Sequence, residues 1–324
     1  MAEEDNHDLY NIWCIKWNYK TGYNYEEIKI NFEINNFKIN NPCMFGTINF
    51  EGNLILRDRK EFIILHENLT YIKKDKKTGE DVETEFCKTW LKDKNIKTYE
   101  KIDFLPMQTP PKNIYNCFNG YNIIKNNFNN YDEDLNFEDS LIYNHIKNLC
   151  NNNNSCVDYF IKFLARKIKE PSKLTNTAII FKSKQGAGKD LFFNYFGKKI
   201  IGSKYYLLTE KPNKLFDRFT SSLVDKILIV INETSGKDTY EINENIKSAI
   251  TASDNLIEYK GKEPYNNTNN IGYIFLTNND NPLKIPHDDR RFCGIECNNN
   301  ICNNAEYFNS LIKEMDGGKY DKSF

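Results

Sequence analysis

The segment AIIFKSKQGAGKDLFF, residues 178–193, carries the pattern with the clearest chemical meaning in the sequence. An apolar run ends at Phe181, a loop with two glycines follows, and a second apolar segment begins after Lys189. Such a loop can curl so that backbone N–H groups point at phosphate oxygens, while a helix N-terminus and a lysine ammonium add positive charge. The spacing predicts a phosphate-binding loop (P-loop), with the binding residues Ser183, Gln185, Gly186, Ala187, Gly188, Lys189 and Asp190.

Two positions depart from the usual pattern G-x-x-x-x-G-K-[ST]. Ser183 stands at the first glycine, where a small residue can still make the turn. Asp190 replaces the serine or threonine that holds magnesium. A carboxylate can bind Mg²⁺ directly, but it adds negative charge beside the β-phosphate. We therefore expect nucleotide binding to survive, with Asp190 as a candidate metal ligand.

A second apolar run, KILIVI at 226–231, ends in Asn232-Glu233. A glutamate at the end of a rigid strand can act as the general base that orients water toward a γ-phosphate. Asn232 can hydrogen-bond a water on the metal but brings no charge. Acidic residues also end strands simply as solvated caps, and the preceding P-loop favours the catalytic interpretation of Glu233.

Two further groups follow along the chain. The run IGYIFLT at 271–277 leads into Asn278, which is placed to sense the γ-phosphate or the attacking water; the competing interpretation is an ordinary turn asparagine. The segment PHDDRRF at 286–292 offers Arg290 and Arg291, either of which could reach the γ-phosphate of a neighbouring subunit. The competing interpretation here is a surface ion pair with an adjacent aspartate.

The segment SDNLIEYKGKEPYNN predicts a hairpin whose tip presents Lys260 and Lys262. In a ring-shaped assembly such tips line the central hole and contact a nucleic-acid backbone through charge. A solvated pair of lysines is the competing interpretation.

The elements that must position these groups follow an alternating pattern from residue 172 onward. Buried strands are predicted at 177–181, 226–231 and 271–277, and helices at 190–200 and 240–251. This alternation predicts an α/β fold around a central, mostly parallel sheet. Upstream, apolar spacing predicts helices at 141–150 and 156–171, and His145 on the first is expected to be a packed or capping histidine.

The sequence divides into three segments. Residues 1–85 are expected to form a small β-rich unit of unknown role, because 27–39 and 61–72 alternate apolar and polar residues and 47–58 contains a turn. Residues 86–171 form a linker rich in aromatics and prolines and then a helical segment. Residues 172–324 form the P-loop ATPase domain.

Composition narrows the class of protein. The 324 residues carry 44 Lys plus Arg against 45 Asp plus Glu, so nucleic acid could be gripped only through a local channel or in an assembly. No apolar run reaches the roughly 18 residues needed to span a membrane, and the acidic start is unlike a secretory signal. Nine cysteines without paired spacing predict free thiols inside a cell. Zinc at His287, Cys293, Cys297 and Cys302 is the disfavoured interpretation.

Taken in order, KSKQGAGKD, ILIVINE, IKSAITASDNLIEYKGK and FLTNNDNPLKIPHDDRRF resemble superfamily 3 helicases, in particular the helicase half of the primase-helicases of large DNA viruses and related phages. The resemblance covers roughly residues 86–300 and no primase half is recognisable in 1–85. It implies an AAA+-like ATPase that uses ATP and Mg²⁺, assembles as a homo-hexameric ring and moves 3′ to 5′ on single-stranded DNA.

The same resemblance assigns roles to the residues above. Lys189 would bind the triphosphate, Glu233 would activate water, Asn278 would sense the γ-phosphate, and Arg290 or Arg291 would act on the adjacent subunit. Lys260 and Lys262 would contact DNA. A separate primase or polymerase is an expected partner, and the host cytoplasm or a viral replication compartment is the expected location.

Two other functions stay open. A degenerate P-loop protein could bind nucleotide or DNA as a scaffold for replication assembly without turnover, and Asp190 and Asn232 favour that possibility. A P-loop phosphotransferase acting on a small molecule is disfavoured, because a sensor asparagine and paired arginines are present but no acceptor pocket is evident.

Overall fold

The computed structural model describes residues 24–50, 52–125, 135–211, 215, 220–232, 239–258, 264–279 and 288–323. The chain forms two compact units. Unit 1 comprises Met1–Asp103 and Pro110–Cys117, and unit 2 comprises Phe104–Thr109 and Phe118–Phe324. This division differs from the three segments expected from the sequence. Within the described ranges, no helix combines the length and the apolar character needed to cross a bilayer.

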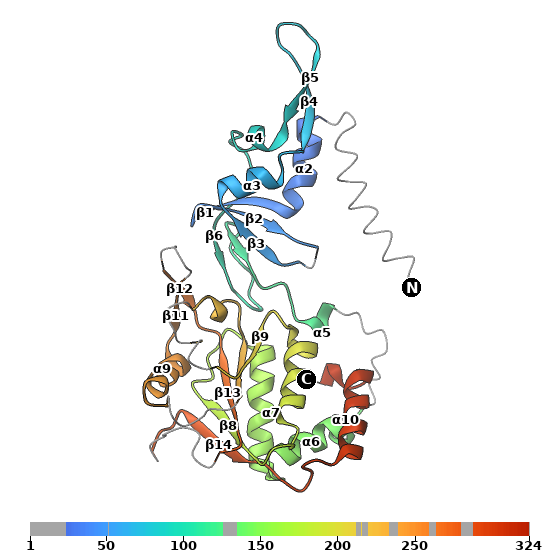
Figure 1. Cartoon of the computed structure of the whole chain (residues 1–324), viewed down its shortest axis with the longest axis vertical. Helices are drawn as coiled ribbons and strands as arrows, with labels where there is room; N and C mark the ends of the chain where they lie inside the picture. Colours follow the sequence, from blue (N-terminus) through green and yellow to red (C-terminus); the bar gives the residue numbers. More distant parts are fainter. Residues whose placement is uncertain are drawn as a thin grey trace. The chain divides into compact units, whose positions relative to one another are not determined.

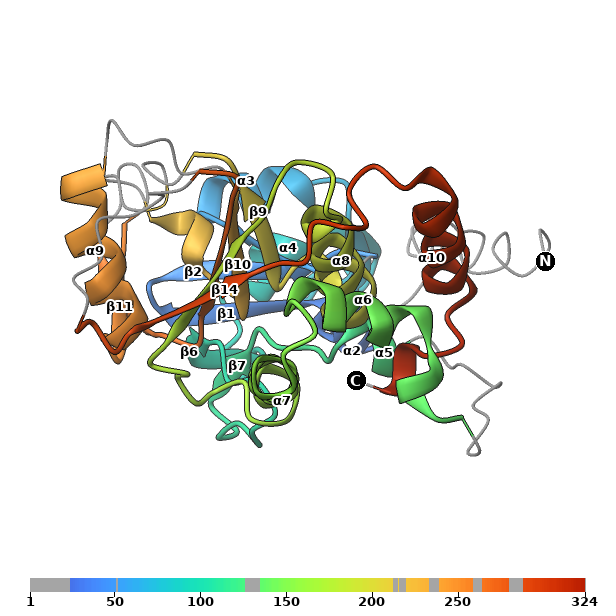
Figure 2. The same cartoon turned by 90° about the horizontal axis from the view of Figure 1, so that it is seen from below.

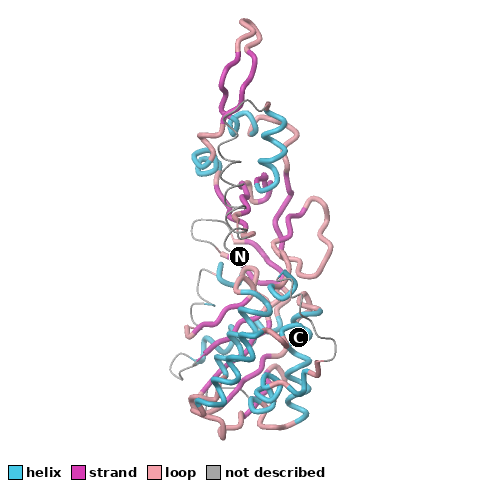
Figure 3. The backbone as a smooth tube through the Cα atoms, turned by 90° about the vertical axis from the view of Figure 1, so that its right-hand side faces the viewer, coloured by secondary structure: helices cyan, strands magenta, loops and turns pink. Residues whose placement is uncertain are grey.

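Unit 1 is built on a five-stranded sheet with the strand order β3-β2-β1-β6-β7, and a separate hairpin, β4–β5, extends away from the rest of the unit (Figures 1 and 3). Its elements are α2 (Tyr25–Asn35), β1 (Asn36–Asn41), β2 (Met44–Ile48), β3 (Leu54–Arg57), α3 (Arg59–Leu65), β4 (Thr70–Lys74), β5 (Asp81–Glu85), α4 (Phe86–Trp90), β6 (Thr98–Asp103) and β7 (Ile114–Asn116). Its core joins α2, α3 and α4 to β2 through Phe32, Phe45, Phe62 and Trp90.

The prediction of a strand at 27–39 is wrong for its first part, because α2 occupies Tyr25–Asn35. A capping box begins the helix: Asn24 Oδ1 accepts from the Glu27 amide, and the Glu27 carboxylate accepts from the Asn24 amide. The helix buries Ile28 and leaves the next apolar residue, Ile30, 68% exposed. An alternating sequence pattern is therefore compatible with a helix that buries one face and leaves isoleucines exposed on the other.

The prediction of a strand at 61–72 fails for the same reason. Asp58 and Glu61 form a second capping box that begins α3, and only the end of the segment is in β4. Unit 1 is thus a mixed α/β unit in which the expected strands are accompanied by helices. The turn predicted within 47–58 is confirmed, because β2 and β3 pair antiparallel around it.

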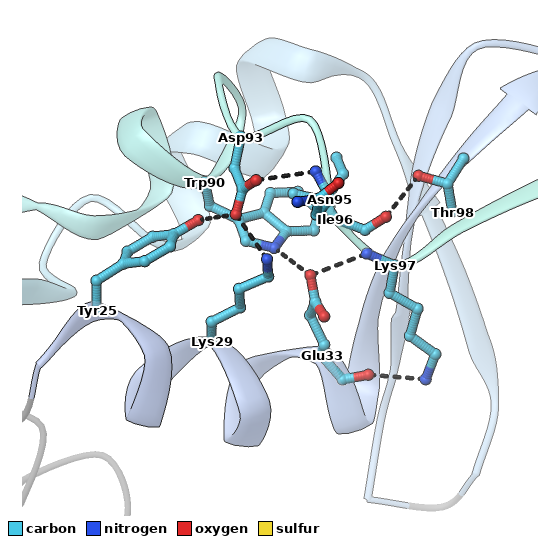
Figure 4. A network of polar contacts seen from close by, with 9 residues as sticks. All are labelled: Tyr25, Lys29, Glu33, Trp90, Asp93, Asn95, Ile96, Lys97 and Thr98. Carbon is cyan, nitrogen blue, oxygen red and sulfur yellow. Dashed lines mark hydrogen bonds and ion pairs between the residues drawn. The ribbon is translucent and has the colours of Figure 1, made fainter.

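Glu33 of α2 connects the helix to the chain between α4 and β6 (Figure 4). Its Oε1 accepts from the Trp90 indole at 2.8 Å and from the Lys97 amide at 2.9 Å. The Lys97 ammonium in turn donates to the Glu33 carbonyl at 2.7 Å. These contacts fix the end of α2 beside the start of β6.

Unit 2 is built on a five-stranded sheet with the strand order β14-β8-β13-β10-β9, in which every neighbouring pair is parallel. Its strands are β8 (Ala178–Lys182), β9 (Tyr206–Thr209), β10 (Leu228–Asn232), β13 (Gly272–Thr277) and β14 (Phe292–Glu296), with a two-stranded pair β11 (Asp254–Ile257) and β12 (Tyr265–Thr268). Its α-helices are α5 (Asn122–Lys125), α6 (Leu141–Leu149), α7 (Asn154–Lys169), α8 (Lys189–Asn194), α9 (Thr239–Thr251) and α10 (Ala305–Gly317).

Short helices complete unit 2: η1 (Phe137–Asp139), η4 (Ser221–Leu223), η5 (Asp321–Ser323) and η2 (Tyr195–Gly202), a π-helix that continues α8. The predicted strands at 177–181, 226–231 and 271–277 and the predicted helices at 141–150, 156–171 and 240–251 are confirmed within a few residues. The helix predicted at 190–200 is confirmed in position, with its second half wound as π-helix. The mixed α/β class with a parallel sheet is therefore confirmed for this unit.

Helices cover both faces of the sheet (Figures 1 and 2). Ile180 of β8 packs in one core cluster with Ile246 of α9. Phe181, the next residue, faces the opposite way and meets Phe160 of α7 at 4.9 Å and Phe193 of α8 at 5.6 Å between ring centroids. Burial on both faces explains why these strands read as continuous apolar runs.

Candidate functional site

The loop 183–188 connects the carboxyl end of β8 to the start of α8. Gly186 and Gly188 adopt the left-handed region, with φ of 84° and 79°. Gly188 is also the residue that caps α8, and a Cβ there would lie 2.7 Å from His145 Cε1. Both glycines are therefore required by backbone conformation, and Gly188 also by close packing.

Lys189 is buried within the site, with 7% of its surface exposed. Its ammonium donates to Ser183 Oγ at 2.5 Å, to the Thr277 carbonyl at 2.9 Å and to Asn278 Oδ1 at 2.8 Å. The structure thus brings together three predicted residues, Ser183, Lys189 and Asn278, from two loops that are far apart in sequence. The lysine is held in place by polar groups that phosphate oxygens could replace.

Asp190 and Asn232 also meet, since Asn232 Nδ2 donates to Asp190 Oδ2 at 3.2 Å. The register explains the meeting: Asn232 of β10 pairs with Leu276 of β13, and Lys182 of β8 pairs with Thr277. The carboxyl ends of β8, β10 and β13 therefore lie at one edge of the sheet. Lys189, Asp190, Asn232 and Asn278 therefore lie at the same edge.

The connections that leave β8 and β13 at this edge run toward opposite sides of the sheet. After β8 the chain runs to β9 at one border of the sheet, and after β13 it crosses to β14 on the other side of β8. Ligands of open α/β sheets bind outside the carboxyl ends of strands at such a switch point. The loops after β8 and β13, which hold Lys189 and Asn278, flank this position.

The two arginines have different surroundings. Arg291 forms a forked ion pair with Asp289, with Nε to Oδ1 and NH2 to Oδ2 both 2.8 Å. This contact lowers the pKa of the Asp289 carboxyl and holds Arg291 within its own chain. Arg290 is exposed, and the described residues form no ion pair with it.

Several predicted residues lie outside the described residues: Glu233, Lys260, Lys262 and His287. For the two lysines, the flanking backbone is informative. β11 and β12 pair antiparallel, and Ile257 faces Tyr265 in the register. The segment 258–264 therefore connects the two strands of a hairpin, as the sequence predicted.

His145 and the cysteines bear on whether the chain holds a metal ion. His145 is fully buried, as expected for a packed or capping histidine, and its Nε2 lies 3.2 Å from the Gly188 carbonyl. The cysteines of the described part are free thiols. Within that part, no group of three or more His, Cys, Asp or Glu side chains is arranged to hold a metal ion.

The hydrogen bonds that asparagines after β14 form with the loop 183–188 were not predicted from the sequence. Asn299 Oδ1 accepts from the Lys184 amide at 2.8 Å, and the Asn303 amide donates to the Gly186 carbonyl at 3.3 Å. Both lie in an asparagine-rich stretch after β14 that gives no distinctive signal. Their role depends on β14 lying next to β8.

Comparison with known proteins identifies relatives of this site and fold. Residues 181–291, which run from the end of β8 to Arg291, match a family of unknown function, DUF5906. The DNA primase-polymerase of Nitratiruptor phage NrS-1 is 29% identical over 200 residues, covering 56% of this chain and 27% of that protein. The aligned segment therefore spans about a quarter of the length of that phage protein.

Solved structures give the same relationship at the level of the fold. An A-form apo structure of the NrS-1 C-terminal region aligns with a TM-score of 0.68 at 19% identity, and a second apo structure with 0.66 at 20%. Each alignment covers 89% of this chain and 66% of the solved chain. The chain has the fold of that C-terminal region, and its similarity is to a viral replication protein.

Proposed function

We propose that this chain is the ATP-hydrolysing helicase part of a viral-type replication protein, which moves on single-stranded DNA and unwinds duplex. The observation that carries the proposal is the convergence of Lys189, Asn278, Asp190 and Asn232 at the carboxyl edge of the parallel sheet. Polar groups gathered at one point of the sheet edge can contact one ligand together and stabilise charge that develops on it. Similarity to a phage DNA primase-polymerase supports the replication setting.

In this proposal each group acts on one part of the triphosphate. The Lys189 ammonium exchanges its contacts with Ser183, Thr277 and Asn278 for β- and γ-phosphate oxygens. Asn278, released from the lysine, turns to the γ-phosphate or the attacking water. Glu233, the residue after Asn232 at the end of β10, orients that water as general base.

The pair Asp190–Asn232 fits a magnesium ion. In P-loop enzymes the loop hydroxyl and a strand-end aspartate together give one neutral oxygen and one carboxylate. Here the loop gives the carboxylate and the strand end gives the amide oxygen, so the charge and the donor types are the same but exchanged. When bound, the ion neutralises charge on the β- and γ-phosphate oxygens.

An AAA+-like ring is the assembly we propose, and the fully parallel sheet with β8 between β13 and β14 supports it. Arg290 is then the residue that reaches the neighbouring subunit's γ-phosphate, because Arg291 is engaged by Asp289. The hairpin β11–β12 carries Lys260 and Lys262 toward DNA, with 3′ to 5′ movement as the family resemblance implies.

The test is magnesium-dependent ATP hydrolysis by the whole chain, with and without single-stranded DNA. Wild-type turnover stimulated by DNA is expected. Lys189→Ala should lose nucleotide affinity, and Glu233→Gln should bind nucleotide but lose hydrolysis. Stimulated turnover that persists in Lys189→Ala would exclude this site as its source.

One observation favours a second function. Asp190 places a carboxylate close to where the β-phosphate is expected, and the strand end, with Asn232, offers no carboxylate of its own. A chain that binds nucleotide through Lys189 but shows no turnover in the same experiment would be a scaffold for replication assembly.

A further inference from the structure

The outer side of the P-loop contacts two segments that lie far from it in the sequence. One is α6, and the other is the chain from Asn298 into α10. Residues of these two segments form hydrogen bonds with three backbone groups of the loop: the Lys184 amide, the Gly186 carbonyl and the Gly188 carbonyl. Three residues make these contacts, Asn299, Asn303 and His145, and Tyr307 contacts His145. We call these four residues the P-loop bracket.

His145 is the centre of the bracket. Its Nε2 lies 3.2 Å from the Gly188 carbonyl, its Nδ1 lies 3.1 Å from the Tyr307 hydroxyl, and its ring is fully buried. A carbonyl can only accept, so Nε2 carries the hydrogen and Nδ1 accepts from Tyr307. Burial lowers the pKa of His145 to about 4, so the ring is neutral at physiological pH, as this tautomer requires.

The two segments of the bracket are also hydrogen-bonded to each other. Asn148, one turn after His145 on α6, donates to the Tyr307 hydroxyl at 3.5 Å. Its carbonyl accepts from the Asn298 amide at 2.8 Å, which ties α6 to the stretch after β14. The two segments therefore form one support, and a change in either is transmitted to the other.

Packing adds to these hydrogen bonds. A Cβ on Gly188 would lie 2.5 Å from the Phe308 ring, and a Cβ on Gly186 would lie 2.3 Å from Asn303 Oδ1. Each left-handed glycine is thus covered on its outer side by a bracket segment. The loop cannot shift outward without displacing α10 or the asparagine stretch.

We propose that the P-loop bracket positions the loop for phosphate binding, with His145 and Asn299 as its principal positioning residues. This inference rests on the proposed function, because it assumes that phosphate is the ligand of the loop. None of the four residues touches the reacting atoms in this scheme. They act through the backbone of residues 184–188.

The test compares two Tyr→Phe variants that each remove one hydroxyl from unit 2. Tyr307→Phe removes the contacts to His145 and Asn148. Tyr121→Phe removes the contact from its hydroxyl to the Lys167 carbonyl at 2.9 Å and serves as the matched control. A second pair is Asn299→Leu, which removes the acceptor, and Asn299→Asp, which keeps it.

Two measurements are made on the whole chain. Amide hydrogen exchange of residues 183–189 without nucleotide reports the loop itself. Titration with fluorescent ADP reports phosphate affinity, at a temperature where denaturant curves show every variant folded. Loss of one buried hydrogen bond corresponds to roughly a fivefold change in an equilibrium constant.

We expect Tyr307→Phe and Asn299→Leu to speed exchange in 183–189 and to weaken ADP binding about fivefold. Tyr121→Phe should stay close to wild type in both measurements, and Asn299→Asp, which adds a charge near the loop, should stay close to wild type in exchange. Unchanged exchange and affinity in Tyr307→Phe and Asn299→Leu would overturn the bracket. If wild type and Lys189→Ala bind ADP equally, the proposed function fails, and the exchange measurement still decides whether the bracket orders the loop.

Discussion

At the scale of single residues, the site differs from the usual P-loop pattern at two positions that turn out to be partners. Asp190 and Asn232 are 42 positions apart in the sequence, yet their side chains form a hydrogen bond of 3.2 Å. Considered singly, each departure removes a side chain that binds the metal in the usual pattern. Considered together, they place one carboxylate and one neutral amide side by side, which is the basis of the proposed exchange of ligand roles.

This exchange predicts the behaviour of a reciprocal pair of substitutions. Asp190→Ser leaves no carboxylate to bind Mg²⁺, and Asn232→Asp adds a second carboxylate beside the phosphates, whose negative charge it repels. Each single variant should therefore lose about tenfold in Mg²⁺-dependent ATP hydrolysis, and the double variant should recover most of the loss. The Mg²⁺ dependence of ATP-analogue binding provides a second readout without turnover.

The two single variants and the double variant form a double-mutant cycle, and one result would contradict a shared metal site. If the two effects simply add, with the double variant worse than either single one, the two residues do not share a metal. The proposed exchange of ligand roles would then be abandoned.

At the scale of elements, unit 1 shows how α2 is fastened to the chain after α4. Asp93 Oδ2 accepts from the Lys29 ammonium at 2.6 Å and from the Tyr25 hydroxyl at 2.7 Å (Figure 4). The side chains of Lys29 and Asp93 are only 11% and 18% exposed, which sets this ion pair apart from the exposed pairs on the surface. Mainly through the hydrogen bond from Lys29, the pKa of Asp93 falls to about 2.

Asp93→Asn is expected to lower the free energy of unfolding by about 1–2 kcal/mol near neutral pH. The lowered pKa means that the stabilisation is fully present above the ordinary value of 3.8 and is lost as the pH falls through about 2. The difference between wild type and variant should therefore shrink over this range. Urea unfolding followed at several pH values measures it.

A matched control is available on α7. The Lys162–Asp158 pair has a similar distance, 2.7 Å, but its side chains are 73% and 62% exposed. Asp158→Asn should change stability by less than about 0.5 kcal/mol at any pH. If Asp93→Asn and Asp158→Asn lower the free energy of unfolding equally, burial of an ion pair does not determine its contribution to stability.

At the scale of the whole molecule, the proposed ring needs a residue that acts between subunits, and Arg290 is the candidate. Arg290 should be needed for hydrolysis on the neighbouring subunit, whereas Lys189 is needed on its own. Both Arg290→Ala and Lys189→Ala are therefore expected to lose turnover when purified alone.

Mixing the two inactive variants tests this arrangement. In a mixed ring, some intact P-loops of Arg290→Ala subunits face the arginine of a Lys189→Ala subunit, so an equal mixture should recover about a quarter of wild-type turnover. ATP hydrolysis measured against mixing ratio gives the result. Full activity of Arg290→Ala alone, or no gain on mixing, would contradict a role between subunits.

The sequence by itself determined β8, β10 and β13, the helices between 141 and 251, and the order of the polar groups of unit 2. Long apolar runs predicted β8, β10 and β13, because a parallel strand buried on both faces has no polar alternation to obscure it. The glycines of the P-loop were predictable because left-handed backbone and close packing exclude other residues. Unit 1 was less predictable, because Ile28 and Ile30 alternate as in a strand while a capping box at Asn24 and Glu27 begins a helix.

Only the tertiary structure decided which residues meet. The order of strands in the sheet brings Asn278 to Lys189 and Asn232 to Asp190, and strand order is set by long-range packing that leaves no local trace in the sequence. For the same reason Arg290 and Arg291 could be distinguished only by the ion pair of Arg291 with Asp289. His145 reaches the P-loop because α6 packs beneath it, a contact between positions 43 residues apart.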